Sequence, residues 1–224
     1  MRTVDFTTLK NFAGELQPDN RYVDDHYALD LHWTMYDRVL DITPATVDSP
    51  YRDRYFISKG HRATALYIVL ARKGFIPFHW LESMYEPESP LGGHPDRLRI
   101  PGVEISSGSL GHGLPLALGS LAAMRAQGLT KPHMYVVIGD GELDEGSNHE
   151  AIAYAGLTGT AGLTAIVLDN DSASHGWGGD LPGRFTAHGW TAETVDTSDH
   201  DALARAALDH RADGPKVVVA RYRA

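Results

Sequence analysis

Met134-Tyr135-Val136-Val137-Ile138-Gly139-Asp140-Gly141 is the stretch that decides the fold. Its run of consecutive apolar residues indicates a strand covered by helices on both faces, as in a parallel sheet. The run ends in a single carboxylate between two glycines, at the position where a doubly wound sheet binds phosphate groups. A bare carboxylate there would repel phosphate, and a hard divalent cation between the two removes the conflict. The stretch therefore predicts a metal–diphosphate site.

A second polar pair, Asp169-Asn170, follows the next apolar segment along the chain. Asn170 stands 30 positions after Asp140, about the length of one strand-helix-strand unit. Neighbouring parallel strands end at the same edge of a sheet, so both side chains would reach one point there. For the glycine turn alone, an ordinary strand-to-helix turn capped by Asp140 is the simple alternative. The second pair favours the metal–diphosphate site.

Hydrophobic periodicity gives the remaining elements. Helical spacing predicts helices over 27–40, 61–73, 114–127, 145–157 and 201–210. Apolar runs predict strands over 134–138, 163–168 and 216–221. The proline-containing segment 77–101 reads as a long loop with a short helix near 79–85. We therefore predict one domain over 1–224, with an α/β fold in which a mostly parallel sheet is flanked by helices on both faces, and an irregular segment at about 1–25.

Composition excludes several classes of protein. The chain has 224 residues, a net charge of -9 and no cysteine. A nucleic-acid groove would need a basic stripe, disulfides and thiolate metal sites need cysteine, and no apolar run reaches the length of a membrane span. The acidic loop also lacks the G-x-G-x-x-G and Gly-Lys-Ser/Thr patterns of nucleotide-binding loops. We expect a cytoplasmic protein that binds neither nucleic acid nor membrane.

Three further blocks precede the glycine turn. They are Asp53-Arg54-Tyr55-Phe56-Ile57-Ser58-Lys59-Gly60-His61, Gly93-His94-Pro95 and Ser107-Gly108-Ser109-Leu110-Gly111-His112-Gly113. Together with the turn and Asn170, their order and spacing resemble the thiamine-diphosphate-binding domain of transketolase over about Asp30 to Arg221. The resemblance implies the thiamine-diphosphate-binding fold, and it implies thiamine diphosphate with Mg2+, or with Ca2+ or Mn2+, as cofactors.

The resemblance also assigns the cofactor contacts residue by residue. It implies that Asp140 and Asn170 hold the metal together with the backbone carbonyl of Ser172. Gly141 would meet the diphosphate through its N–H. The residues implied at the aminopyrimidine end are Gly108, Ser109 and Leu110.

Three polar residues receive roles in catalysis and assembly from the same resemblance. His61 would reach the diphosphate or the reacting centre, although by position alone it could be only a helix cap. His94 would hydrogen-bond the ketol oxygens of the donor sugar, a task for a group that both donates and accepts near neutral pH. Glu145 resembles an acid of the dimer interface that links two active sites.

The N-terminus departs from the family pattern. Asp19-Asn20-Arg21-Tyr22-Val23 stands where transketolases carry a Ser-Gly-His-Pro-Gly segment, so a histidine that contacts substrate is missing. Arg21 or His26 could offer a replacement donor. His112 stands where glutamine is usual and receives no role. The altered pocket leaves room for an unusual acceptor in specialised metabolism.

The resemblance covers the diphosphate-binding half of transketolase and excludes the pyrimidine-binding half, with its activating glutamate. We therefore expect the N-terminal subunit of a split transketolase, which transfers a two-carbon ketol unit from a ketose or ketose phosphate to an aldehyde. The expected partner is a C-terminal subunit carrying the missing half, in an α2β2 heterotetramer. Alternatives are an α-type subunit of a 2-oxo acid dehydrogenase or a deoxyxylulose-phosphate synthase-like enzyme, or a non-catalytic module. The Gly93-His94-Pro95 block favours transketolase.

Overall fold

A computed structural model describes residues 6–15, 26–61, 63–173, 180–209 and 213–222 of the chain. The helices are α1 (Phe6–Glu15), α2 (His26–Thr34), α3 (Thr64–Arg72), α4 (Gly113–Ala126), α5 (Gly146–Leu157), α6 (Leu181–Thr186) and α7 (His200–Leu208). The strands are β1 (Arg54–Ile57), β2 (Met134–Gly139), β3 (Leu163–Asp169), β4 (Thr191–Asp196) and β5 (Lys216–Arg221). Shorter turns are the π segment η2 (Met35–Val39) and the 3-10 segments η3 (Pro44–Thr46), η4 (Phe78–Ser83) and η5 (Gly141–Asp144).

The five strands form one parallel sheet in the order β1-β2-β3-β5-β4. Every residue of β2 and β3 is buried, as the mostly apolar sequences of both strands require when helices cover both faces. The predicted α/β fold with a parallel sheet is therefore confirmed. In the part of the chain that the structure describes, no helix has both the length and the apolar character needed to cross a membrane.

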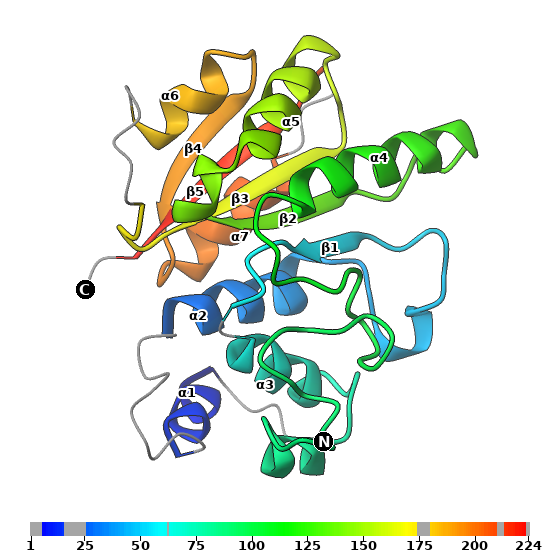
Figure 1. Ribbon diagram of the computed structural model, residues 1–224, viewed down its shortest axis with the longest axis vertical. Coiled ribbons are helices and arrows are strands. Elements are labelled where there is room, and N and C mark those ends of the chain that lie inside the picture. The colour runs from blue at the N-terminus through cyan, green and yellow to red at the C-terminus, as the bar shows by residue number, and fades with distance from the viewer. Residues whose placement is uncertain (1–5, 16–25, 62, 174–179, 210–212, 223–224) are drawn as a thin grey trace.

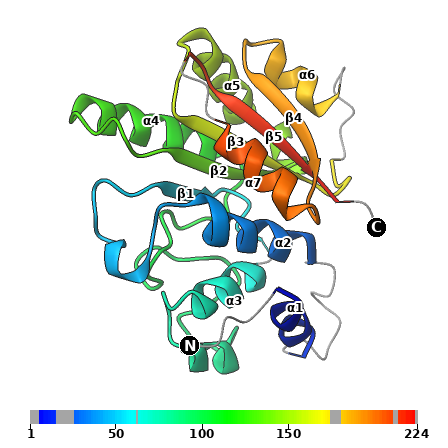
Figure 2. The ribbon, with the colours of Figure 1, turned by 180° about the vertical axis from the view of Figure 1, so that it is seen from behind.

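Helices cover the sheet in two layers (Figures 1 and 2). Helices α2 and α7 lie on one face, with α3 packed on the outer side of α2, and α4, α5 and α6 lie on the other face. Successive residues of a strand point to opposite faces, so Tyr135 and Val137 join the core under the first layer while Val136 and Ile138 join the core under the second. The sheet thus holds both layers, and its carboxyl edge is the place where the strand-end loops gather.

Four elements were not predicted from the sequence. Strand β1 has only four residues and begins on a charged arginine, and β4 is an edge strand whose side chains are mostly half-buried. Such segments carry too little hydrophobic periodicity to identify. Helix α6 is short, and α1 lies inside the segment 1–25 that was expected to be irregular. The flanking residues 1–5 and 16–25 lie outside the described residues.

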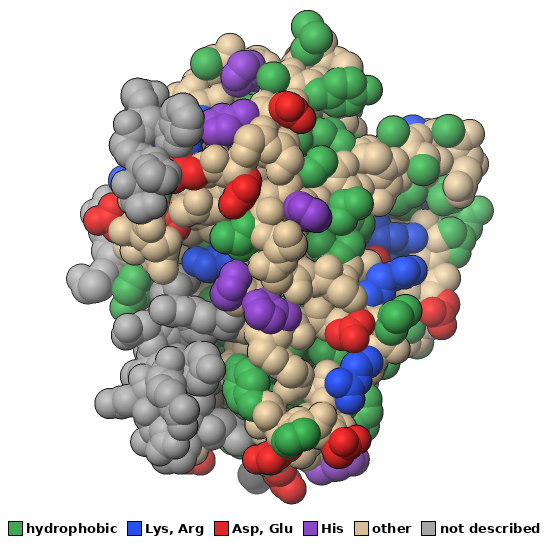
Figure 3. All heavy atoms as spheres, viewed as in Figure 1, with side chains coloured by type: hydrophobic (Ala, Val, Ile, Leu, Met, Phe, Trp, Pro, Cys, Tyr) green, Lys and Arg blue, Asp and Glu red, His purple; other side chains and the backbone are tan. Residues whose placement is uncertain are grey.

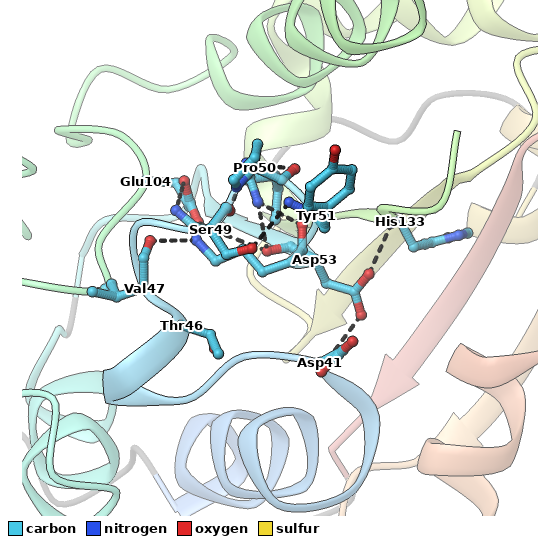
Figure 4. A network of polar contacts seen from close by, with 12 residues as sticks. Asp41, Thr46, Val47, Ser49, Pro50, Tyr51, Asp53, Glu104 and His133 are labelled. Carbon is cyan, nitrogen blue, oxygen red and sulfur yellow. Dashed lines mark hydrogen bonds and ion pairs between the residues drawn. The ribbon is translucent and has the colours of Figure 1, made fainter. Parts of the chain in front are cut away.

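A polar network fixes the beginning of β1 (Figure 4). The Asp53 carboxylate accepts hydrogen bonds from the backbone N–H of Asp41, at 3.0 Å, and of His133, at 2.8 Å. Arg52 forms an ion pair with Glu104, and each side chain is only about a tenth exposed. His133 directly precedes β2, and Glu104 directly precedes the loop that enters α4. Arg52 and Asp53 therefore connect the beginning of β1 to both of these segments.

Candidate cofactor site

Asp140 lies at the carboxyl edge of the sheet, directly after β2, and is 1% exposed. Its backbone N–H donates to the carbonyl of Leu168 in the neighbouring strand, at 3.3 Å. Its carboxylate accepts the backbone N–H of Ser172 at 2.5 Å, the Ser172 hydroxyl at 2.6 Å and the backbone N–H of Ala173 at 3.0 Å. The structure therefore brings together Asp140 and Ser172, which the sequence reasoning assigned to one site.

Gly141 and Asn170 flank the same point. A Cβ added to Gly141 would lie 3.4 Å from the Ser172 carbonyl oxygen, so that carbonyl lies against the turn. Asn170 is the first residue after β3, and Asp171, with a φ of 57°, turns the chain back toward Asp140. One carboxylate, one amide and one carbonyl offer the oxygen donors that Mg2+ and Ca2+ prefer. No cluster of three or more acidic or imidazole side chains suited to a metal occurs among the described residues, so a metal here would depend on this mixed set.

The predicted histidines form a second group. The rings of His61 and His94 lie 4.8 Å apart between centroids in an edge-to-face arrangement, and both side chains are exposed. Gly108 has a φ of 134°, and a Cβ there would lie 2.9 Å from a ring carbon of His94. The N-cap of α3 is Ala63, so His61 is not the cap of that helix. The glycine at 108 is therefore what lets the His94 ring lie against the loop backbone.

Although the His61 side chain is largely exposed, the burial of part of it lowers its pKa, and the neighbouring charges of His94 and Lys59 lower the pKa further. A lowered pKa favours the neutral imidazole near pH 7. A neutral imidazole donates a hydrogen bond from one ring nitrogen and accepts one at the other. The pair therefore has the capacity to bind hydroxyl and carbonyl oxygens of a sugar.

Glu142 connects the two groups, and sequence reasoning missed it. The side chain is 2% exposed and accepts hydrogen bonds from the Ser58 hydroxyl, from the Gly111 N–H at 2.8 Å and from the Gly139 N–H at 3.2 Å. Burial raises the pKa of Glu142, while these three hydrogen bonds and the charge of Lys59 act in the opposite direction. The only signal in the sequence was a carboxylate directly after the Gly139-Asp140-Gly141 turn.

The remaining acids of the loop have separate roles. Asp144 pairs with Arg184 of α6 at 3.4 Å, and Glu145 is the exposed N-cap residue of α5. A Cβ added to Gly111 would lie 2.6 Å from the Cβ of Glu145, so the Glu145 side chain lies against the loop that enters α4. Its role at an interface stays a prediction.

The residues expected at the aminopyrimidine end lie in that loop. Ser109 is exposed and Leu110 is half-buried. His112 is the N-cap residue of α4, and its Nε2 lies 3.5 Å from the Ser109 hydroxyl. Arg21 lies outside the described residues, and His26 begins α2 with a side chain outside the described part.

Histidine side chains gather near the middle of the face shown in Figure 3. A separate groove of about 780 Å3 runs beside α4, with the cationic Arg54 and Arg97 and the apolar Leu98 and Leu116 in its walls. None of the predicted site residues lines this groove. The candidate site is therefore the carboxyl edge, where the loops after β1, β2 and β3 meet the loop that enters α4.

Comparison with known proteins agrees with this geometry. Residues 27–222 match the family model described as transketolase, thiamine diphosphate binding domain. A transketolase from Pichia stipitis in complex with sedoheptulose 7-phosphate superimposes with a TM-score of 0.84 at 25% identity, over 96% of this chain and 35% of that one.

Curated relatives include proteins that are named as transketolase subunits. The chain is 46% identical over 192 residues to "Ferredoxin fas2" of Rhodococcoides fascians, covering 86% of the chain and 63% of the relative. It is 48% identical over 118 residues to one of the named subunits of the apulose-4-phosphate transketolase of Actinobacillus succinogenes, covering 53% and 42%. It is 34% identical over 178 residues to the 6-deoxy-6-sulfo-D-fructose transketolase subunit SqwG of a Clostridium species, covering 77% and 64%.

The chain spans less than two thirds of the length of each of these three relatives. It has no cysteine, so its own residues offer no thiolate for the iron–sulfur cluster that the name ferredoxin denotes in the first of them. The chain belongs to the transketolase family, as its thiamine-diphosphate-binding domain.

Proposed function

We propose that the chain is the N-terminal subunit of a two-component transketolase, which transfers a two-carbon ketol unit from a ketose or ketose phosphate to an aldehyde. The observation that carries the proposal is the meeting of Asp140 with Ser172 at neighbouring strand ends. At the same edge of the sheet, the His61 ring lies against His94, and His94 packs on Gly108. The partner would be a C-terminal subunit that supplies the pyrimidine-binding domain and the activating glutamate, in an α2β2 heterotetramer. Relatives named as transketolase subunits support a partner chain.

The oxygen donors at the carboxyl edge would hold a divalent metal. Asp140, the side chain of Asn170 and the carbonyl of Ser172 would bind Mg2+, or Ca2+ or Mn2+, and the Gly141 N–H would contact the diphosphate. When bound, thiamine diphosphate supplies the nucleophilic carbon and electron sink for transfer of the ketol unit. The residues proposed for its aminopyrimidine end are Gly108, Ser109 and Leu110.

The chain's own contribution to the reaction would be orientation and hydrogen bonding. His61 and His94 would bind the oxygens of the ketose, and the packing of His94 on Gly108 would fix its ring. Glu145, exposed at the N-terminus of α5, would reach across the interface between subunits. We assign the glutamate that activates thiamine diphosphate to the partner subunit.

Calorimetry with Mg2+ and thiamine diphosphate, with and without the co-purified partner, tests the proposal. Asp140→Ala should abolish metal-dependent binding, because it removes the only charged oxygen donor of the proposed set. Asp144→Asn is the matched control: it changes an acid of the same loop that pairs with Arg184, so binding should persist. Unchanged binding by Asp140→Ala would contradict the metal site, and ketose turnover by the chain alone would contradict the need for a partner.

A further inference from the structure

Glu142 is unusual because it lies two positions from the proposed metal ligand yet turns into the protein interior. Its side chain is 2% exposed, and no cationic side chain donates one of the three hydrogen bonds described for it. Burying a carboxylate is costly unless hydrogen bonds replace its water shell. Here the Ser58 hydroxyl and two backbone N–H groups, of Gly111 and Gly139, do so. An arrangement of this kind fixes its donors as firmly as it fixes the carboxylate.

The three donors lie at the carboxyl edge, one after β1, one in the loop that enters α4 and one at the end of β2. Ser58 follows β1, 84 positions away in the sequence, and Gly111 lies in the loop that enters α4, 31 positions away. Gly139 ends β2. The Ser58 hydroxyl also accepts the backbone N–H of Gly113 at 2.9 Å, which ties the first residue of α4 to the same centre.

The main chain of Glu142 is fixed as well. Its carbonyl accepts a hydrogen bond from the side-chain amide of Asn148 at 2.7 Å, and Asn148 is completely buried in α5. Its backbone carbonyl also accepts the N–H of Glu145, at 3.1 Å, where α5 begins. The side chain therefore links loops across the sheet, while the backbone links the turn to its own helix.

We propose that Glu142 is a positioning residue for the cofactor site, a buried carboxylate that sets the Gly139–Gly141 turn at a fixed distance from the Ser58–His61 and Gly108–Gly113 loops. The proposal rests on the proposed function, because those loops carry the residues assigned to the two ends of thiamine diphosphate. It also accounts for an acidic loop beside a diphosphate: Glu142 directs its charge inward, away from the phosphate groups. Loss of the carboxylate should let the loops drift apart and weaken binding of a ligand that must touch all of them.

Glu142→Gln tests the proposal with little change in shape. An amide has one acceptor oxygen in place of two, so its NH2 group would face either the Gly139 N–H or the pair of donors from Ser58 and Gly111. In the complex with its partner, calorimetry should show thiamine diphosphate, at saturating Mg2+, binding about tenfold more weakly, equivalent to about 1.4 kcal/mol. Ser58→Ala, which removes one donor and keeps the carboxylate, should weaken binding in the same direction.

Thr164→Val is the matched control. It removes a buried hydrogen bond between the Thr164 hydroxyl and the His133 Nε2, at 2.9 Å, in the same sheet but at the opposite end of the strands from the site. It should lower the unfolding midpoint as the Glu142 and Ser58 variants do, and leave cofactor affinity unchanged. The amide proton signals of Gly111 and Gly139 in the free chain give a readout independent of the cofactor: they should shift upfield in Glu142→Gln and stay in place in the control.

The outcomes separate this proposal from the proposed function. If the wild-type complex fails to bind thiamine diphosphate with Mg2+, the proposed function is wrong, whatever the glycine signals do. If the wild-type complex binds and both Glu142→Gln and Ser58→Ala bind equally well, the positioning role is wrong and Glu142 is a structural brace only. Equal loss of affinity in Thr164→Val would overturn it too, because the effect would then follow stability.

Discussion

Gly108→Ala tests whether the His94 ring depends on a missing side chain. Gly108 has a φ of 134°, a conformation that costs an L-residue about 1–3 kcal/mol. The new Cβ would also lie 2.9 Å from a ring carbon of His94, so the imidazole must move. At about 2–4 °C per kcal/mol for a chain of this size, the unfolding midpoint should fall by about 2–12 °C. Turnover by the assembled enzyme should fall as well, and by more than the loss of stability accounts for, since we propose that the displaced His94 ring binds the substrate.

Gly119→Ala is the control for the same chemical change. Gly119 lies inside α4, and a Cβ there meets nothing within 4 Å. Alanine should stabilise the helix by about 0.5–1 kcal/mol and raise the midpoint without affecting turnover. Thermal unfolding of the free chain and a ketol-transfer assay of the complex measure both effects. If Gly108→Ala unfolds at the wild-type temperature and turns over normally, the close packing of His94 on this loop is wrong.

Three further substitutions test the fold and its pH response. Burial lowers the pKa of His32 from 6.5 to about 3, so the unfolded chain binds the proton first. The free energy of unfolding should therefore fall by about 1.4 kcal/mol per pH unit as the pH drops below about 6.5. Denaturant titrations of His32→Gln should lack that dependence on pH. Gly156→Ala puts a Cβ 1.7 Å from the His188 carbonyl oxygen, so soluble yield should collapse, and wild-type stability would contradict the packing. Glu104→Gln deprives Arg52 of its carboxylate and should cost about 2 kcal/mol in chemical denaturation; no loss would exclude a bracing role.

The sequence was sufficient to predict the central strands because their residues are mostly apolar. Tyr135 to Ile138 is apolar at every position, and only a strand covered on both faces requires that. The turn after it predicted that Asp140 and Asn170 lie at one edge, since neighbouring parallel strands end there. Ser172 was assigned by the resemblance, and the structure bonds its N–H and hydroxyl to the Asp140 carboxylate. By contrast, β4 consists largely of Thr, Glu and Asp at the sheet border, where solvent removes the periodic signal.

The sequence predicted the residues of the site that face the proposed ligand, but not the buried residue that holds the loops together. His61, His94 and Gly108 were identified by their blocks, and the structure brings them together. Glu142 was not, because an acid in an acidic loop looks like a solvated side chain until the folded chain brings Ser58 and Gly111 to it from distant positions. No local pattern encodes that convergence.

The strand order also implies an order of folding. Partners Met134 and Leu163 in the β2–β3 pair are 29 positions apart, whereas Arg54 and Met134 in the β1–β2 pair are 80 apart. Closing the longer loop costs more chain entropy, so we expect the β2–α5–β3 unit to form first and β1 to join later. Native-state hydrogen exchange should then show β1 amides opening at a lower free energy than those of β3.

Asp140 and Asn170 lie on the early unit, and His61 follows the late strand. A cofactor that touches both would recognise only the completed sheet, and it would contribute nothing at the barrier where β1 is still unpaired. Thiamine diphosphate with Mg2+ should therefore slow unfolding of the assembled protein and leave the refolding rate of the chain unchanged. In kinetic terms, the cofactor would stabilise the sheet only after its central strands have formed and β1 has joined them.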